Sequence, residues 1–214
     1  MIPRRFIRTI PASPPAGAGI FWERFQDLHP AWEFVTYQDP IDPALFPATA
    51  PLWPHCTSGA QLAGLVRLEA LWRHGGIYVD ADVEPYRSFE PLLGVEGFAA
   101  WEDVKVVPDA VLGARAGHPA IMTAIIEAKA AVKAERGAWE SGPGVTTRLL
   151  PGRTDFLLLP PGAFYPVHYL DPPPPAGWRP PPWAFARHHW AASWLTAEQK
   201  ARNEAIRSSH QRGA

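Results

Sequence analysis

The stretch from residue 65 to residue 84, LVRLEALWRHGGIYVDADVE, constrains the fold of this chain most strongly. Its first half has apolar residues at the spacing of an amphipathic helix, and Gly75 stands where a helix would end. Ile77–Val79 is a β-favouring run, and Asp80 and Asp82 follow it. Residues i and i+2 of an extended chain point to the same side, so the two carboxylates face one way. Carboxylates suit Mg²⁺ and Mn²⁺, so the pattern predicts a divalent-metal site.

The surroundings of the acid pair make it more specific than an isolated Asp-x-Asp, which is usually solvated surface charge. The matching residues are Arg67, Leu71, Gly75–Tyr78, Asp80 and Asp82. This ordered run resembles the central signature of the DXD-containing sugar transferases, a family that includes yeast mannosyltransferases and bacterial capsule and lipooligosaccharide glycosyltransferases. The resemblance implies that Arg67 reaches a sugar-nucleotide donor. From the residues alone, Arg67 could instead be a surface arginine paired with Glu69 or Asp82, and Tyr78 could contact the donor or pack in the sheet.

Composition sets wider limits. The chain has 214 residues and a formal net charge of −1, which gives no electrostatic case for binding nucleic acid. Cys56 is the single cysteine, so no internal disulfide forms. No apolar run approaches the length of a transmembrane helix, and the first ten residues do not resemble a signal peptide. We therefore expect one domain over residues 1–214, acting in the cytoplasm.

The order of predicted elements indicates the fold class. Residues 3–10 and 32–37 are predicted strands around a helix at 20–28, a unit that gives parallel pairing. We expect an α/β fold with a mostly parallel, Rossmann-like central sheet flanked by helices, and the resemblance implies the GT-A version of it. Further helices are predicted at 59–74, 118–134, 145–150 and 196–209, and strands at 77–79, 97–101, 110–114 and 156–159.

Three other segments carry expectations. Residues 38–58 are predicted to be a proline-rich loop without clear periodicity, and residues 171–182, with seven prolines, a stiff surface loop. Residues 196–214 are predicted to form a C-terminal helix and tail. In the helix at 118–134, the four residues expected to face inward are Ile121, Met122, Ile125 and Ile126.

The resemblance extends to the start of the chain, where Ile2 and Pro3 match the family's opening strand and so are expected near the donor. Ile7 and Ile10 stand where the family has a histidine and a tryptophan. Gly64 stands where the family has an aspartate, three residues before the arginine, which implies a changed donor sugar or a weakened activity. Two further family blocks have counterparts in the Gly-Pro loop at 141–144, expected to form a wall of the cleft, and in Asp109, which replaces an asparagine.

The end of the chain completes the resemblance. Residues 187–194, RHHWAASW, contain a His-His pair that alone would more often be packing than ligation. The family closes with a similar H-x-W-x-x-S-W block, which returns to the metal and the diphosphate. His188, His189 and Ser193 therefore stay open as the additional metal ligand. The full set of residues expected to bind the donor is Ile2, Pro3, Arg67, Gly76, Tyr78, Asp80 and Trp194.

The function that this pattern implies is a retaining glycosyltransferase dependent on Mn²⁺ or Mg²⁺. It would move a sugar from a UDP- or GDP-linked donor to a saccharide or other hydroxyl acceptor, with Asp80, Asp82 and Arg67 as catalytic residues. One alternative is a nucleotide-sugar-binding protein of weak activity, which Gly64 suggests. The other is a haloacid-dehalogenase-type phosphatase with Asp80 as nucleophile and Asp82 as acid, although no D-D or D-x-x-x-D pair follows for its metal.

Overall fold

A six-stranded sheet forms the centre of the computed structural model, which describes residues 1–191 and 197–212. The strand order is β2-β1-β3-β6-β5-β7, and only β6 runs antiparallel to its neighbours. The predicted α/β class with a mostly parallel sheet is therefore confirmed. The strands are β1 Arg5–Ile10, β2 Glu33–Gln38, β3 Gly76–Val79, β5 Gly97–Ala100, β6 Val111–Ala114 and β7 Leu157–Leu159.

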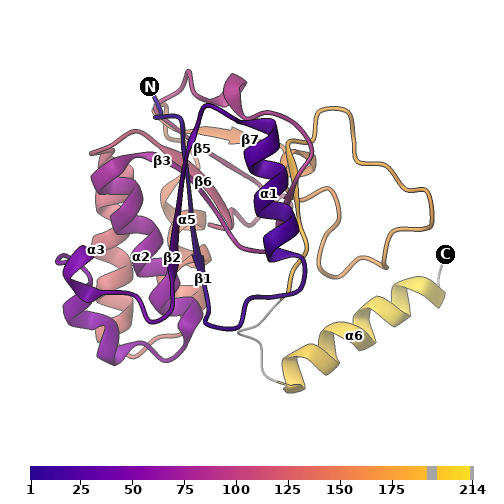
Figure 1. The fold of residues 1–214 in the computed structure, drawn as a ribbon. Helices are drawn as coiled ribbons and strands as arrows, with labels where there is room; N and C mark the ends of the chain where they lie inside the picture. Colours follow the sequence, from indigo (N-terminus) through magenta and orange to yellow (C-terminus); the bar gives the residue numbers. More distant parts are fainter. Residues whose placement is uncertain (192–196, 213–214) are drawn as a thin grey trace.

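Helices cover both faces of this sheet (Figure 1). α2 Gly59–His74 and α3 Pro119–Lys133 pack on one face over a largely aliphatic core, whereas α1 Ala18–Leu28 lies on the other over an aromatic core centred on Phe6. The other helices are α4 Ala138–Ser141, α5 Pro143–Leu149, α6 Ala197–Arg212 and the 3₁₀ turns η1 Pro43–Leu45, η2 Ala50–His55, η3 Glu90–Leu92 and η4 Pro161–Ala163. Among the described residues, no helix is both long and apolar enough to cross a bilayer.

The bounds of α2 follow from its caps. The Ser58 side chain accepts a hydrogen bond from the Gln61 backbone N–H at 3.2 Å, which satisfies a free donor at the first turn. Gly75, at φ +64°, ends the helix, and a Cβ there would lie 2.6 Å from the Ala116 backbone nitrogen. A Cβ on Gly76 would lie 2.8 Å from the Arg5 carbonyl oxygen. Both positions need glycine because β3 passes so close to its neighbours.

A second, two-stranded sheet was not predicted. β4 Val83–Pro85 pairs antiparallel with β8 Ala186–His188, so the end of the chain lies directly beside the segment after the acid pair. Three-residue strands carry no periodicity that a sequence could reveal, and their partners lie about a hundred residues apart. The expectation that the C-terminal block returns to the acid pair is confirmed for its described part.

The predicted proline-rich loop at 38–58 contains the 3₁₀ turns η1 and η2 and buries Phe46 and Leu52 in the core. One local prediction was wrong. Ile126 does not face inward, since 61% of it is exposed. It lies about 100° around the helix from Ile125, which takes the inward position. The proline-rich segment at 171–182 contains no helix or strand, as predicted.

Glu69 explains how the 38–58 segment is held on α2. Its carboxylate is fully buried and accepts hydrogen bonds from the backbone N–H groups of Ala48, at 3.0 Å, and Thr49, at 2.8 Å. It also accepts one from the Thr49 hydroxyl at 2.7 Å. These three donors, together with the Arg73 guanidinium 3.9 Å from Glu69 Oε1, satisfy the buried charge.

Replacing Glu69 with glutamine should therefore destabilise the fold. The new amide turns one acceptor into a donor that faces backbone N–H groups, so we expect the free energy of unfolding to fall by about 1–3 kcal/mol. Urea denaturation measures this loss. Glu127→Gln, at a partly exposed position on α3, is the matched control and should change stability by less than about 0.5 kcal/mol. Equal stability of the two variants would contradict the anchoring role of Glu69.

Candidate functional site

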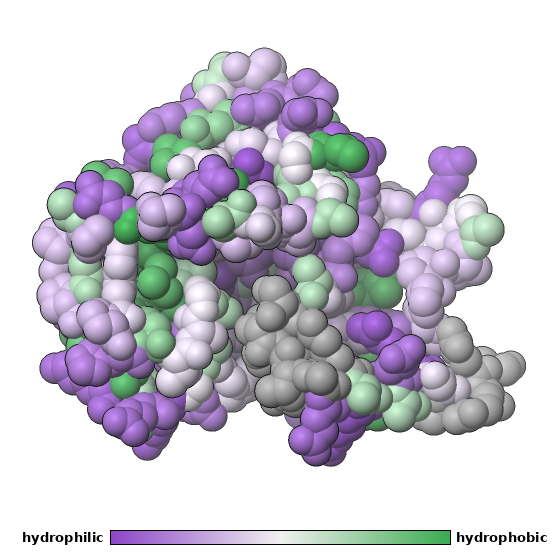
Figure 2. Space-filling model, turned by 60° about the horizontal axis from the view of Figure 1, so that its bottom comes forward, coloured by the Kyte–Doolittle hydropathy of each residue, from purple (hydrophilic) through white to green (hydrophobic). Residues whose placement is uncertain are grey.

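Three carboxylates lie at one edge of the main sheet, at the carboxyl ends of β3 and β5. Asp80 follows β3, Glu102 lies two residues beyond β5, and Asp109 precedes β6. They meet because β6 is antiparallel: Val79 pairs with Val111, and the Asp80 N–H donates to the Ala110 carbonyl at 2.8 Å. Figure 2 turns this side of the molecule forward and shows a hollow in a largely polar surface. In open α/β sheets, such an edge is where ligands bind.

Arg67 joins two of these acids. It rises from α2, is only 5% exposed, and its guanidinium lies 2.6 Å from Asp80 Oδ1 and 2.5 Å from Asp109 Oδ2. Burial acts against its charge, but Asp109 and Asp80 outweigh burial and raise the pKa of Arg67 well above its usual value. The alternative of a surface arginine paired with Glu69 or Asp82 is therefore wrong. Arg67 is a permanent positive charge under the sheet edge.

Tyr78 positions Asp80 and does not face the hollow. Its side chain is fully buried, its ring lies 4.2 Å from the Arg67 guanidinium carbon, and its hydroxyl donates to Asp80 Oδ1 at 3.0 Å. The Thr9 hydroxyl is a further partner at 2.7 Å. Burial raises the pKa of Tyr78, so the phenol stays a donor. The expected contact of Tyr78 with a donor is contradicted by this packing in the sheet.

Asp82 is fixed by the returning C-terminal segment. Its Oδ1 lies 3.2 Å from Nε2 of His188, and its Oδ2 accepts a hydrogen bond from the Ala191 N–H at 2.7 Å. Burial alone would raise the pKa of Asp82, but His188 and this N–H outweigh it and lower the pKa to about 2. Asp82 is therefore an anion throughout the physiological pH range.

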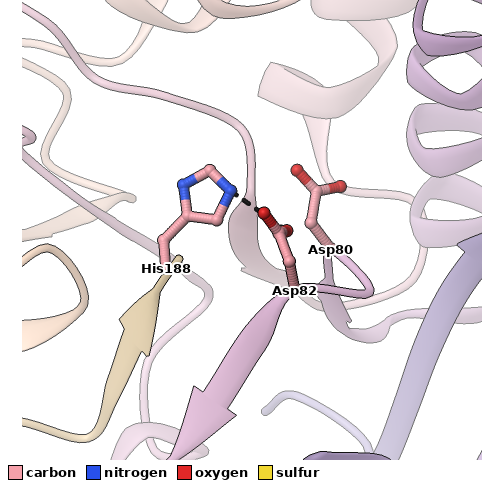
Figure 3. A group of neighbouring side chains, drawn as sticks. All are labelled: Asp80, Asp82 and His188. Atoms are coloured by element: carbon pink, nitrogen blue, oxygen red, sulfur yellow. Dashed lines mark ion pairs between the residues drawn. The ribbon is translucent and has the colours of Figure 1, made fainter. Parts of the chain in front are cut away.

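Asp80, Asp82 and His188 form a candidate metal site (Figure 3). One ligand atom from each lies within 4.8 Å of the others. Two ligands of one Mg²⁺ are at most about 4.2 Å apart, so a shift of less than about 1 Å would complete the triangle. The Nδ1 atom of His188 is buried and has no hydrogen-bond partner among the described residues.

His189 is not part of this triangle, so its expected role as a metal ligand is wrong. Its Nε2 lies 2.9 Å from Glu84 Oε2, and its ring stacks on Phe21 with centroids 5.0 Å apart. Consecutive residues of an extended chain point to opposite sides, so His188 and His189 cannot both face Asp82. Ser193 and Trp194, the other C-terminal residues expected at the site, lie outside the described residues.

Three residues expected at the donor lie at the wrong end of the sheet. β1 and β3 run parallel, with Ile7 opposite Tyr78, so Ile2, Pro3 and Gly76 lie near the start of these strands while Asp80 lies past their end. Ile2 is buried in the aromatic core, and Gly76 packs on Arg5. At about 3.3 Å per residue, Ile2 is more than ten ångströms from the edge. The family motif identified the correct strands, but it did not show at which end of these strands the candidate site lies.

Gly64 borders empty space. It is buried on α2, yet a Cβ built there would meet nothing within 4 Å. It lies one turn from Arg67 and one turn from Gln61, whose amide bonds Ser141 Oγ at 3.0 Å. The space beside Gly64 is thus framed by the Gln61–Ser141 contact and by Arg67.

Comparison with known proteins relates part of this chain to a described family. Residues 21–99 match the family described as the glycosyltransferase sugar-binding region containing the DXD motif. This part of the chain is therefore similar to the sugar-binding region of glycosyltransferases. That region includes Gly64 and Arg67 as well as Asp80 and Asp82, so the resemblance inferred from the sequence is confirmed.

Individual relatives of this glycosyltransferase region are more distant. Inositol phosphoceramide mannosyltransferase 3 of Schizosaccharomyces pombe is 28% identical over 106 residues, which cover 46% of this chain and 29% of that protein. The chain thus matches less than a third of the length of this curated relative. PaToxG glycosyltransferase superposes with a TM-score of 0.55 at 14% identity, over 70% of this chain and 69% of that chain, which shows the glycosyltransferase fold. A glycosyltransferase involved in glycosylating the major capsid of PBCV-1 gives a TM-score of 0.48 at 13% identity, over 94% and 98% of the two chains.

The space beside Gly64 can be tested by filling it. Gly64→Ala adds a methyl group that meets no atom and removes a glycine from a helix, so we expect a gain of about 0.5–1 kcal/mol in the free energy of unfolding. Gly142→Ala is the comparison, because its Cβ would lie 3.0 Å from the Ala138 carbonyl oxygen and 3.1 Å from Asp109 Oδ2. Thermal or urea unfolding should rank Gly64→Ala above wild type and Gly142→Ala below it. A destabilised Gly64→Ala protein would show that this space is filled.

Proposed function

We propose that this chain is a retaining, metal-dependent glycosyltransferase that moves a sugar from a nucleoside-diphosphate donor to a hydroxyl acceptor. The main observation behind the proposal is that Asp80, Asp82 and His188 meet at one edge of the sheet. The two aspartates belong to the matched sugar-binding region, and His188 lies about a hundred residues further along the chain. The retaining stereochemistry rests on the resemblance to the DXD sugar transferases. NMR of the anomeric proton of the first product would test it.

The donor set favours a divalent cation. Two carboxylates with one imidazole suit Mn²⁺, and they tolerate Mg²⁺, which prefers oxygen ligands. Such a cation, bound by Asp80, Asp82 and His188, would act as a Lewis acid on the leaving diphosphate. The protein's part is to hold its ligands still: Arg67 and Tyr78 fix Asp80, while the Ala191 N–H fixes Asp82. Arg67, held by Asp80 and Asp109, would add a preorganised positive charge to this site when a diphosphate binds.

The donor and acceptor classes extend this proposal. We propose a UDP- or GDP-linked sugar as donor and a saccharide or another hydroxyl compound as acceptor, and the name of the mannosyltransferase relative favours a hexose. The structure gives no support to the phosphatase alternative. Asp80, which would be its nucleophile, is held by the buried Arg67 and by Tyr78. The binding-protein alternative keeps one observation in its favour, the space beside Gly64.

Asp82→Asn tests the metal site. The amide keeps the shape of the side chain but loses the charge, so the folded protein should bind nucleoside diphosphate in Mn²⁺ at least about tenfold more weakly. Isothermal titration calorimetry with UDP and with GDP, with and without Mn²⁺, measures this change. Asp27→Asn, at an exposed position on α1, is the control and should bind like wild type. Unchanged Mn²⁺-dependent affinity in Asp82→Asn would refute the assignment.

Gly64→Asp tests the choice of donor sugar. The new carboxylate would enter the space beside Arg67 and offer an acceptor for sugar hydroxyls. Sites that gain or lose a hydrogen-bonding partner change their discrimination between substrates. We expect wild type and Gly64→Asp to rank a panel of UDP- and GDP-sugars differently in a hydrolysis assay. The same strict preference at similar rates in both proteins would show that position 64 does not select the sugar.

A further inference from the structure

Glu102 is a buried carboxylate of the same sheet edge that the metal site does not use. It is 8% exposed, and its backbone N–H donates to the Val106 carbonyl at 2.8 Å, which closes a tight turn after β5. Asp103 tightens the turn by accepting from the Val106 N–H at 2.9 Å. β6 separates β5 from β3, so Glu102 lies two strand spacings from Asp80, roughly 10 Å. It is therefore a rigid group at the same sheet edge, across β6 from Asp80.

His168 holds the carboxylate of Glu102 in place. Its Nε2 lies 2.8 Å from Glu102 Oε1, and its Nδ1 accepts the Leu170 N–H at 3.1 Å. An imidazole nitrogen that accepts an N–H carries no proton, so the proton of His168 is on Nε2, facing the carboxylate. Both ring nitrogens of His168 are therefore engaged, and neither is free to bind another group. Glu102 Oε2 has no hydrogen bond or ion pair within the described part of the chain.

An unpaired donor accompanies this carboxylate. The hydroxyl of Tyr165 is buried beside the Val111 backbone, and it donates no hydrogen bond to any described residue. Burial raises the pKa of Tyr165, and the charges of Glu102, Asp109 and Asp80 raise it further, so the hydroxyl stays protonated among three carboxylates. A carboxylate that only accepts and a phenol that here only donates are complementary to a group that does both. An alcohol hydroxyl is such a group.

Partly exposed rings lie beside Glu102 and connect it with the metal site. Tyr169 follows His168 and packs on Trp190 with ring centroids 5.4 Å apart, and Trp190 lies 4.1 Å from His188. Trp190 adopts φ +56°, an unusual backbone conformation for a tryptophan. Such conformations persist where the surrounding structure enforces them, and they gather at ligand sites. Tyr169 and Trp190 offer flat apolar faces, which match the apolar face of a sugar ring, and the Trp190 N–H is held by the Val167 carbonyl at 3.1 Å.

We propose that Glu102, held by His168, binds a hydroxyl group of the acceptor saccharide, whose ring lies against Tyr169 and Trp190. This inference rests on the proposed function and assigns its acceptor side. Glu102 is a binding residue, and His168 is a positioning residue that acts through it. The donor then occupies the side of Arg67 and Gly64, so the two substrates approach Asp80 and Asp82 from opposite directions along the sheet edge.

The test is binding of simple acceptors to the protein preloaded with Mg²⁺ and nucleoside diphosphate. Saturation-transfer NMR with the methyl glycosides of mannose, glucose and galactose reports which of them contacts the protein, and a titration gives its dissociation constant. Glu102→Gln removes the charge that accepts the hydroxyl, so we expect this constant to rise roughly tenfold to a hundredfold. The affinity of the same protein for Mg²⁺ and nucleoside diphosphate, measured by calorimetry, should change less than threefold.

Two further variants separate position from packing. Glu96→Gln replaces an exposed glutamate just before β5, at the other end of the same strand, and should bind glycoside like wild type. His168→Ala should weaken glycoside binding, whereas His168→Gln, which keeps an N–H donor near the Nε2 position, should restore most of it. A purely structural histidine would give equal binding in these two folded variants.

Clear results would overturn the inference. It fails if wild type binds none of the glycosides, if Glu102→Gln binds them as wild type does, or if Glu102→Gln loses nucleotide affinity to the same extent as glycoside affinity. The last result would move Glu102 to the donor side. Mn²⁺-dependent hydrolysis of nucleotide sugars by wild type, assayed separately, tests the proposed function itself, so the two ideas can fail independently.

Discussion

The buried ion pairs of Arg67 are the interaction on which the site depends. One guanidinium joins α2 to the end of β3 through Asp80 and to the start of β6 through Asp109. A buried charge is tolerated only where partners offset the loss of water, and here two carboxylates and the face of Tyr78 do so. Removing the arginine would leave two acids without compensation at the sheet edge. The same contact that holds three elements together therefore sets the orientation of Asp80, the first of the proposed metal ligands.

The second and third ligands depend on a different constraint, the short pairing of β4 with β8. This pairing places His188 opposite Val83, one residue from Asp82. The Ala191 N–H then reaches the Asp82 carboxylate. Neither contact involves Arg67, so the triangle of ligands is assembled by two independent parts of the fold. A metal ion bound there would connect them, because its ligands come from both.

Local patterns made one part of this arrangement predictable from the sequence. The helix at 59–74 matches its predicted bounds because Ser58 and Gly75 supply a start signal and a stop signal around an apolar periodicity. Asp80 and Asp82 were found because the strand before them fixes their direction within two residues. Strand direction was what the motif match left out, and it is why Ile2, Pro3 and Gly76 were assigned to the wrong end of the sheet.

What could not be predicted involves contacts between distant segments. The Arg67–Asp109 pair and the Glu102–His168 pair join residues 42 and 66 positions apart by residue number, and neither has a local signal. The choice between His188 and His189 depended on the register of β8, a strand too short to recognise in the sequence. Asp109 could be seen in the sequence as an acid where the family has an asparagine. A buried arginine on α2 needs an acidic partner, and that need would have pointed to Asp109.

Asp80, Asp82 and His188 are proposed to bind one divalent cation together with the donor diphosphate. Crystals grown with Mn²⁺ and a nucleoside diphosphate, measured for anomalous scattering at the manganese absorption edge, test it directly. We expect one strong anomalous peak within coordination distance of all three side chains, with diphosphate oxygens completing the coordination shell. A peak elsewhere in the protein, or a bound nucleotide with no peak between these residues, would contradict it.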